Sequence, residues 1–179
     1  RKLSMTVNAR HKVTFALVDE RFVPPDHPGS NEAMLRRALA KPLRGGARLA
    51  PMYGTGTVEQ AALRADGAYA PLHFDIALLG MGADGHTASW FPGAAGLAEA
   101  LDRRSARSVV ALHAPQAAAC AERLSLTLAA ILRADRVVLL ITGADKFAAL
   151  DAARNQEPEA VPVAALLGGA VSMLEILWA

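Results

Sequence analysis

Five short apolar runs alternate with longer, alanine-rich segments along this chain of 179 residues. The runs are Val13–Val18, Phe74–Leu79, Val109–Leu112, Val137–Thr142 and Val171–Trp178. The hydrophobic residues in these runs are continuous rather than alternating with polar ones, which is typical of strands buried on both faces. The runs therefore predict a mostly parallel sheet.

Helix signals lie between the runs. Ser30 is placed to cap a segment that extends through Leu39, and Thr57 with Gln60 forms a capping box ahead of Ala61–Ala68. The other two predicted helices are Ser125–Leu132 and Asp145–Ala153. Strands that alternate with helices predict the α/β class, here a three-layer α/β/α sandwich with a mostly parallel, Rossmann-like sheet. We expect a single α/β domain over residues 1–179.

The composition narrows the class of protein. The formal net charge is only +2 and the basic residues are scattered, which argues against a nucleic-acid partner. No apolar run reaches the length of a membrane span, so we expect no membrane partner. The single cysteine, Cys120, excludes a disulfide framework and a zinc site built from thiols, and it favours a cytoplasmic location.

Charged residues and glycines follow three of the predicted strands. The first strand runs into Asp19–Arg21, the second into the glycine-rich segment Gly80–His86, and the fourth into Gly143–Lys146. Ligands of open parallel sheets bind beyond the carboxyl ends of the strands. We therefore expect the functional site at this edge of the sheet.

The glycine-rich segment has two interpretations. Gly80, Gly82 and Gly85 have the spacing of a dinucleotide-binding turn, but that spacing alone is a weak signal. Pro92 leaves little room for the long helix that such a turn requires, and the next strand ends in His113 rather than in an acid for the ribose hydroxyls. The second interpretation is that the glycines let backbone N–H groups approach an oxygen-rich ligand.

Asp84 and His86 are the candidate chemical groups of this turn. A histidine accepts a proton near neutral pH, and a neighbouring carboxylate fixes its tautomer and raises its basicity. The alternative is that Asp84 caps a following helix and that His86 lies in the first turn of that helix. The spacing of the two residues leaves both interpretations open.

The segment Phe74–Gly93, FDIALLGMGADGHTASWFPG, resembles the signature of the 6-phosphogluconolactonases and of the related glucosamine-6-phosphate isomerase/deaminases. The similarity continues, in order, through Val13–Asn31, Glu122–Leu128, Val137–Lys146 and the closing EILWA. The chain is identified on these residues as a member of that family. The resemblance implies an enzyme of the oxidative pentose phosphate pathway whose partner is a small-molecule sugar-phosphate lactone.

The resemblance also implies roles for the residues of the glycine turn. His86 would be the general base that activates water for attack on the C1 carbonyl of 6-phospho-D-glucono-1,5-lactone, and Asp84 would orient His86. Backbone N–H groups around Gly82 are the candidate donors to the developing oxyanion. Such a reaction needs no metal and no covalent intermediate, so the resemblance implies no cofactor.

Further positions match the substrate-binding part of the family pattern. Arg21 and Lys146 stand at its phosphate-facing positions, and Arg123 is a third cation expected near the site. Taken without the resemblance, Arg21 would be expected to pair with one of its two acidic neighbours. Asn31 is expected either to pin the proline-rich loop before it or to touch the substrate.

Two alternatives to a lactonase follow from the same pattern. The deaminases carry an acid five residues after the histidine, and this chain has Phe91 there, which argues against that isomerase activity. Family members usually begin with an additional β-α portion that carries a phosphate loop, and the comparison implies that this chain lacks it. The second alternative is therefore a sugar-phosphate-binding module without turnover. We expect a monomer or a weak homo-oligomer, because an exposed sheet edge invites self-association.

Overall fold

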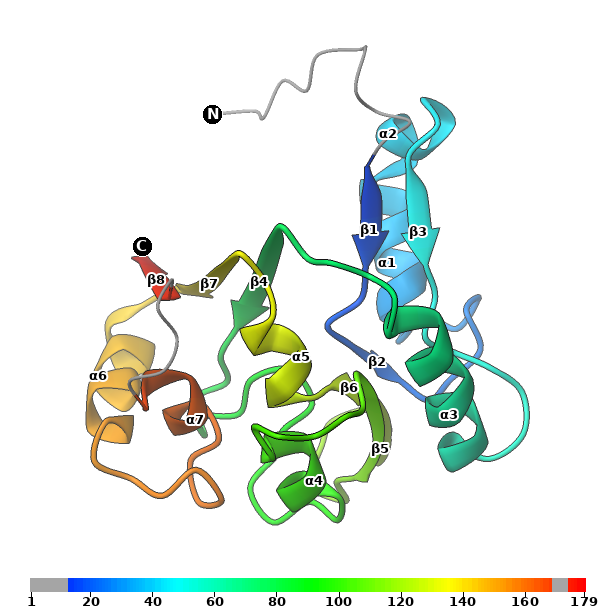
Figure 1. Cartoon of the computed structure of the whole chain (residues 1–179). Helices are drawn as coiled ribbons and strands as arrows, with labels where there is room; N and C mark the ends of the chain where they lie inside the picture. Colours follow the sequence, from blue (N-terminus) through cyan, green and yellow to red (C-terminus); the bar gives the residue numbers. More distant parts are fainter. Residues whose placement is uncertain (1–12, 169–173) are drawn as a thin grey trace.

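The computed structural model describes residues 13–168 and 174–179, and its strands form three small sheets (Figure 1). The first sheet pairs β1 (Thr14–Ala16) in parallel with β3 (Arg48–Ala50). The second is antiparallel, in the order β2 (Asp19–Arg21), β6 (Glu122–Leu126), β5 (Val109–His113). The third is parallel, in the order β4 (Ile76–Gly80), β7 (Arg136–Ile141), β8 (Leu174–Trp178).

Helices connect these strands, and two of the helices begin at side-chain caps that the sequence predicts. They are α1 (Asn31–Ala38), α2 (Ala40–Arg44), α3 (Val58–Tyr69), α4 (Leu97–Leu101), α5 (Leu128–Leu132), α6 (Ala144–Ala153) and α7 (Ala164–Leu167). Ser30 caps α1, and Thr57 and Gln60 form the capping box of α3. Among the described residues no helix combines the length and the apolar character needed to cross a membrane.

One connected hydrophobic core joins the three sheets. It includes Trp90, Ile131 and Leu139, none of which is exposed by even one per cent. The Trp90 Nε1–H donates to the Leu126 carbonyl at 2.9 Å, so the buried indole satisfies its one polar atom. The glycine turn that begins after β4 and the strand β6 are therefore fixed to the same core.

The antiparallel sheet differs from the sequence-based expectation. The run Val109–Leu112 was expected among the parallel strands, but β5 pairs antiparallel with β6. The strand β6 was not predicted, because its polar residues Arg123 and Ser125 disguise a segment that is almost entirely buried. The predicted helix Ser125–Leu132 accordingly begins later, at Leu128, where Thr127 supplies the cap.

The strand β4 also differs from the expectation of burial on both faces. Ile76 and Leu78 are each 57% exposed, whereas the residue after each of them, Ala77 and Leu79, is buried. The next strand, β7, exposes Leu140 on the same face, opposite Gly80 in the register. The described residues therefore leave much of this face exposed, although Val138 at its centre is buried. The predicted strand Val171–Trp178 is found as β8 from Leu174 onward, and its first three residues lie outside the described ranges.

The Tyr69 hydroxyl connects the two strands of the first sheet. It accepts a hydrogen bond from the Leu17 N–H, just after β1, at 3.0 Å and donates to the Ala50 carbonyl of β3 at 2.8 Å. Burial raises the pKa of the Tyr69 phenol above its ordinary value, so the hydroxyl remains a donor. The helix α3 thereby holds β1 and β3 at the point where the chain enters β2.

We expect Tyr69→Phe to lower the free energy of unfolding by about 1–3 kcal/mol, because the Leu17 N–H and the Ala50 carbonyl lose their shared partner in a buried place. Urea denaturation measures the loss. Tyr53→Phe is the matched control, since the Tyr53 ring packs against Phe22 at 5.4 Å and its hydroxyl has no hydrogen bond to the described residues. Equal losses in the two variants would contradict this role of the Tyr69 hydroxyl.

Candidate active site

A cavity of about 770 Å³ lies where the ends of β1, β2 and β4 meet the start of α1 and the start of α6. Its polar and charged lining residues come from six separate stretches of the chain. These residues are Asp19, Arg21, Asn31, Asp84, His86, Gln116, Arg123 and Lys146. All seven residues singled out from the sequence, Gly82 included, line this one cavity.

The turn after β4 brings Asp84 and His86 together. The Gly82 N–H donates to the His86 carbonyl at 2.9 Å, and the Gly85 N–H donates to the Gly82 carbonyl at 3.1 Å. A Cβ atom on Gly82 would collide with the His86 ring and stand 2.6 Å from the Asp84 carboxylate, so only glycine fits there. Gly85 adopts a positive φ of 77°. The two glycines therefore serve the geometry of the turn itself.

The Asp84 carboxylate holds the His86 ring through a short contact. Its Oδ1 atom is 2.5 Å from His86 Nδ1 and accepts the His86 backbone N–H at 3.1 Å. Burial alone would raise the pKa of Asp84, but the hydrogen bonds and the charge of His86 outweigh it and lower that pKa. The ionised carboxylate thus favours a proton on Nδ1, which leaves Nε2 of the neutral ring as an acceptor. No helix starts at Asp84, so the capping alternative is wrong.

The Phe91 ring covers one face of the His86 imidazole. The Phe91 ring stacks on His86 with centroids 4.2 Å apart and an angle of 26° between the planes. The Arg123 guanidinium lies 5.3 Å from the centroid of the same ring. The His86 side chain keeps 30% of its surface exposed, so the ring is oriented but open to the cavity.

Arg21 and Asn31 form a polar pair in the lining of the same cavity. Arg21 Nη1 donates to the Gly29 carbonyl at 2.7 Å and to Asn31 Oδ1 at 3.1 Å. The expected ion pair of Arg21 with an acidic neighbour does not form among the described residues. Arg21 Nε is buried and has no hydrogen-bond partner in the described parts of the chain. Asn31 both pins the preceding loop and lines the cavity, so the two interpretations of this residue are compatible.

Two more cations reach the cavity from different elements. Arg123 on β6 is 4% exposed, and it donates through Nε and Nη2 to the carbonyls of Cys120 and Ala118 at 2.9 and 2.6 Å. Burial lowers the pKa of the Arg123 guanidinium, and the charge of Asp19 partly counters that effect. Lys146 lies in the first turn of α6 and is half-buried. Arg123 therefore also holds its own loop, whereas Lys146 stands at the cavity with no ion pair to the residues described.

Sequence reasoning did not single out Asp19 and Ser89 as site residues. The Asp19 carboxylate lines the cavity and accepts a hydrogen bond of 2.5 Å from Ser89 Oγ. The position of Asp19 after the first strand was a usable signal, but no local pattern indicates a partner 70 residues away. Across residues 13–168 and 174–179, no group of three or more His, Cys, Asp or Glu side chains is arranged to hold a metal ion.

A family model described as glucosamine-6-phosphate isomerases/6-phosphogluconolactonase matches residues 2–178. The chain therefore belongs to this family. The match spans the glycine turn, the strands around the cavity and the lysine of α6. The membership that the sequence motifs predict is confirmed.

Within the family the chain is similar to proteins named 6-phosphogluconolactonase. It is 45% identical over 170 residues to that of Caulobacter vibrioides, covering 94% of this chain and 72% of the relative. It is 42% identical over 180 residues to that of Mesorhizobium japonicum, covering 99% and 74%. The crystal structure of a 6-phosphogluconolactonase from Shewanella baltica superposes with a TM-score of 0.88 at 30% identity, covering 98% of this chain and 76% of that one. This likeness confirms the predicted α/β, Rossmann-like class.

We expect Gly82→Ala to displace the His86 ring from Asp84, because the added methyl group occupies the position of that ring. The imidazole signals of His86 in ¹H–¹⁵N NMR spectra report the loss of the Nδ1 hydrogen bond. Gly80→Ala is the matched control, since a Cβ atom at Gly80 meets nothing within 4 Å. Unchanged imidazole signals in Gly82→Ala would show that the turn accommodates a side chain.

Proposed function

We propose that this chain catalyses the hydrolysis of 6-phospho-D-glucono-1,5-lactone to 6-phosphogluconate, with His86 as the general base. The observation that carries the proposal is the Asp84–His86 pair, 2.5 Å apart, in a cavity that also contains Arg21 and Lys146. The relatives that are 42–45% identical are named for this activity.

The chemistry requires only a base, a positioned water molecule and donors to an oxyanion. In the proposed reaction His86 Nε2 accepts a proton from water as the oxygen bonds to C1 of the lactone. The tetrahedral intermediate then collapses, the bond between C1 and the ring oxygen breaks, and the proton on His86 passes to that oxygen. Asp84 stabilises the transient imidazolium. The N–H groups of Gly82, Gly85 and His86 are already used within the turn, so the candidate donor to the oxyanion near Gly82 is an N–H group that has no partner among the described residues, such as that of Ala83.

The phosphate would lie against the cations of the cavity. Arg21 lines the cavity and, among the described residues, makes side-chain hydrogen bonds only through Nη1, which supports a contact between the rest of its guanidinium and a phosphate oxygen. Lys146 supplies a point charge from the first turn of α6. Arg123 contributes positive potential, with two of its nitrogens already engaged by the loop.

The position of Phe91 favours the lactonase over the isomerase branch of the family. In the deaminase pattern this position carries an acid, whereas here an apolar ring stacks on His86. A carboxylate needed for sugar-ring opening is therefore replaced by a group that orients the base and donates no proton.

The first test is the hydrolysis of freshly prepared lactone, corrected for spontaneous opening, by wild type and His86→Ala. We expect His86→Ala to lower kcat at least ~100-fold, the range expected for loss of a general base, while the affinity for 6-phosphogluconate stays within about threefold. Stopped assays of lactone consumption and calorimetric titration measure the two quantities.

His113→Ala is the control for this experiment. His113 forms the same kind of contact, Nδ1 to Glu122 Oε1 at 2.6 Å, but it does not line the cavity. Its removal should leave kcat unchanged. A wild type that binds 6-phosphogluconate without turnover would instead indicate a sugar-phosphate-binding module, and release of ammonia from glucosamine-6-phosphate would indicate the deaminase.

We expect Lys146→Ala mainly to raise KM for the lactone, because its ammonium would contact the phosphate and remain distant from C1. Steady-state kinetics separate KM from kcat. Lys41→Ala is the matched control, since Lys41 lies on α2 and does not line the cavity. A fall in kcat with unchanged KM would place Lys146 at the reacting centre.

A further inference from the structure

Glu20 is a buried acid that the proposed reaction does not use. It is the middle residue of β2, and its side chain is completely buried. Its neighbours Asp19 and Arg21 point into the cavity, so strand alternation directs Glu20 away from it. A carboxylate without access to solvent must be matched by hydrogen bonds.

Four donors surround the Glu20 carboxylate. Oε1 accepts the backbone N–H groups of Arg21 and Asn31, both at 2.7 Å. Oε2 accepts the Ser30 hydroxyl at 2.9 Å and the Glu32 N–H at 2.7 Å. All four donors come from the end of β2 or from the start of α1. The carboxylate therefore joins the two ends of the intervening loop, and we call this carboxylate with its four donors the Glu20 clasp.

This clasp fixes the two residues that form the polar pair of the cavity. Residues 24–28 of the loop are exposed, so the loop between Arg21 and Asn31 has little packing of its own. The 3.1 Å hydrogen bond from Arg21 Nη1 to Asn31 Oδ1 requires that the backbone at residue 21 and the backbone at residue 31 stay in position. The negative charge of Glu20 also stands at the N-terminus of α1, where the helix dipole stabilises an anion.

We propose that Glu20 is a positioning residue for substrate binding: its carboxylate holds Arg21 and Asn31 in the geometry that receives the phosphate-bearing ligand. The inference rests on the proposed function, because it concerns the same cavity. Glu20 itself touches no substrate. It acts through the direction of the Arg21 guanidinium.

Glu20→Gln tests the inference because the two side chains have the same shape. A carboxylate accepts hydrogen bonds at both oxygens, whereas the amide of glutamine presents N–H groups to two of the four donors. We expect KM for the lactone to rise at least ~10-fold and the affinity for 6-phosphogluconate to fall by a similar factor. We expect kcat to stay within about threefold, since the Asp84–His86 turn is left intact.

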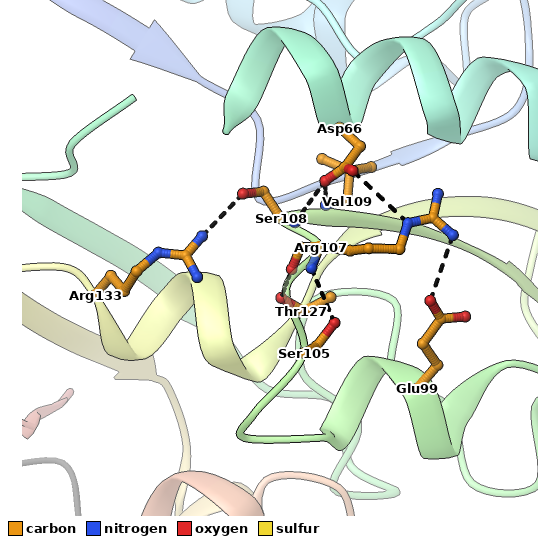
Figure 2. Close-up of polar contacts among 8 residues, drawn as sticks. All are labelled: Asp66, Glu99, Ser105, Arg107, Ser108, Val109, Thr127 and Arg133. Atoms are coloured by element: carbon orange, nitrogen blue, oxygen red, sulfur yellow. Dashed lines mark hydrogen bonds and ion pairs between the residues drawn. The ribbon is translucent and has the colours of Figure 1, made fainter. Parts of the chain in front are cut away.

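Asp66→Asn is the matched control, because it is the same exchange of a carboxylate for an amide at a structural site (Figure 2). Asp66 Oδ1 accepts the N–H groups of Ser108 and Val109 at 2.6 and 3.1 Å, and Asp66 does not line the cavity. Assays are run at the same distance below each melting temperature. Asp66→Asn should then keep the wild-type KM.

Ser30→Ala provides a milder second variant in case Glu20→Gln does not fold. It removes one of the four donors together with the cap of α1. A smaller rise in KM at unchanged kcat is expected. Wild-type KM in folded Glu20→Gln, or in Ser30→Ala when Glu20→Gln is unfolded, would overturn the inference. So would a change in Asp66→Asn equal to that in Glu20→Gln.

Assays of the wild-type protein distinguish a failure of this inference from a failure of the proposed function. If the wild type binds 6-phosphogluconate without hydrolysing the lactone, the proposed function fails and the affinities of the variants for 6-phosphogluconate decide the role of Glu20. If the wild type neither hydrolyses the lactone nor binds 6-phosphogluconate, both proposals fall.

Discussion

Carboxylates that accept backbone N–H groups determine where the loops of this protein lie. Glu20 binds the start of α1 to the end of β2, Asp66 binds the start of β5 to α3, and Asp84 closes the turn after β4. The donors lie at strand ends, in a turn or at the start of a helix, and these are places where regular secondary structure leaves backbone N–H groups without partners. Buried N–H groups without an acceptor are costly, so the first role of these three acids is to bind the backbone. The cavity depends on two of the three, Glu20 and Asp84.

Burial and hydrogen bonds, more than ion pairs, hold the charged side chains of the cavity in place. Arg123 is nearly buried, and two of its nitrogens are bound to carbonyls of its own loop, so its charge is fixed in place. Arg21 is held at one nitrogen and has a second nitrogen without a partner in the described residues. Lys146 is tethered only by its helix. Under the proposed function, one rigid cation beside two less constrained ones suits an anionic substrate that must bind, react and leave.

The sequence predicts best those features that local chemistry determines. The capping box of α3, the helix after Ser30, the helix predicted over Asp145–Ala153 and the parallel direction of β4 and β7 all follow from nearby residues or from apolar continuity. The strand β6 could not be recognised, because the burial of Arg123 and Ser125 arises from tertiary contacts. The hydrogen bond between Ser89 and Asp19 joins residues that no local pattern connects.

Most of the site residues named from the sequence were chosen because they match the family pattern, and the structure places all seven in one cavity. Spacing alone left the capping alternative for Asp84 open, and the geometry of the turn removed it. The roles of these residues stay predictions, since proximity in a cavity does not assign chemistry. The chain spans 72–74% of the length of two of the relatives named above.

Under the proposed function, the environment of His86 suits a general base that acts on an activated ester. Asp84 fixes one nitrogen and Phe91 covers one face, yet the ring keeps part of its surface exposed. A more deeply buried imidazole would resist the positive charge that it gains when it takes a proton from water. Partial exposure lowers that cost, while the carboxylate and the aromatic ring supply the orientation. Under the proposed function, the cavity therefore balances the precision of the base against the solvation of its protonated form.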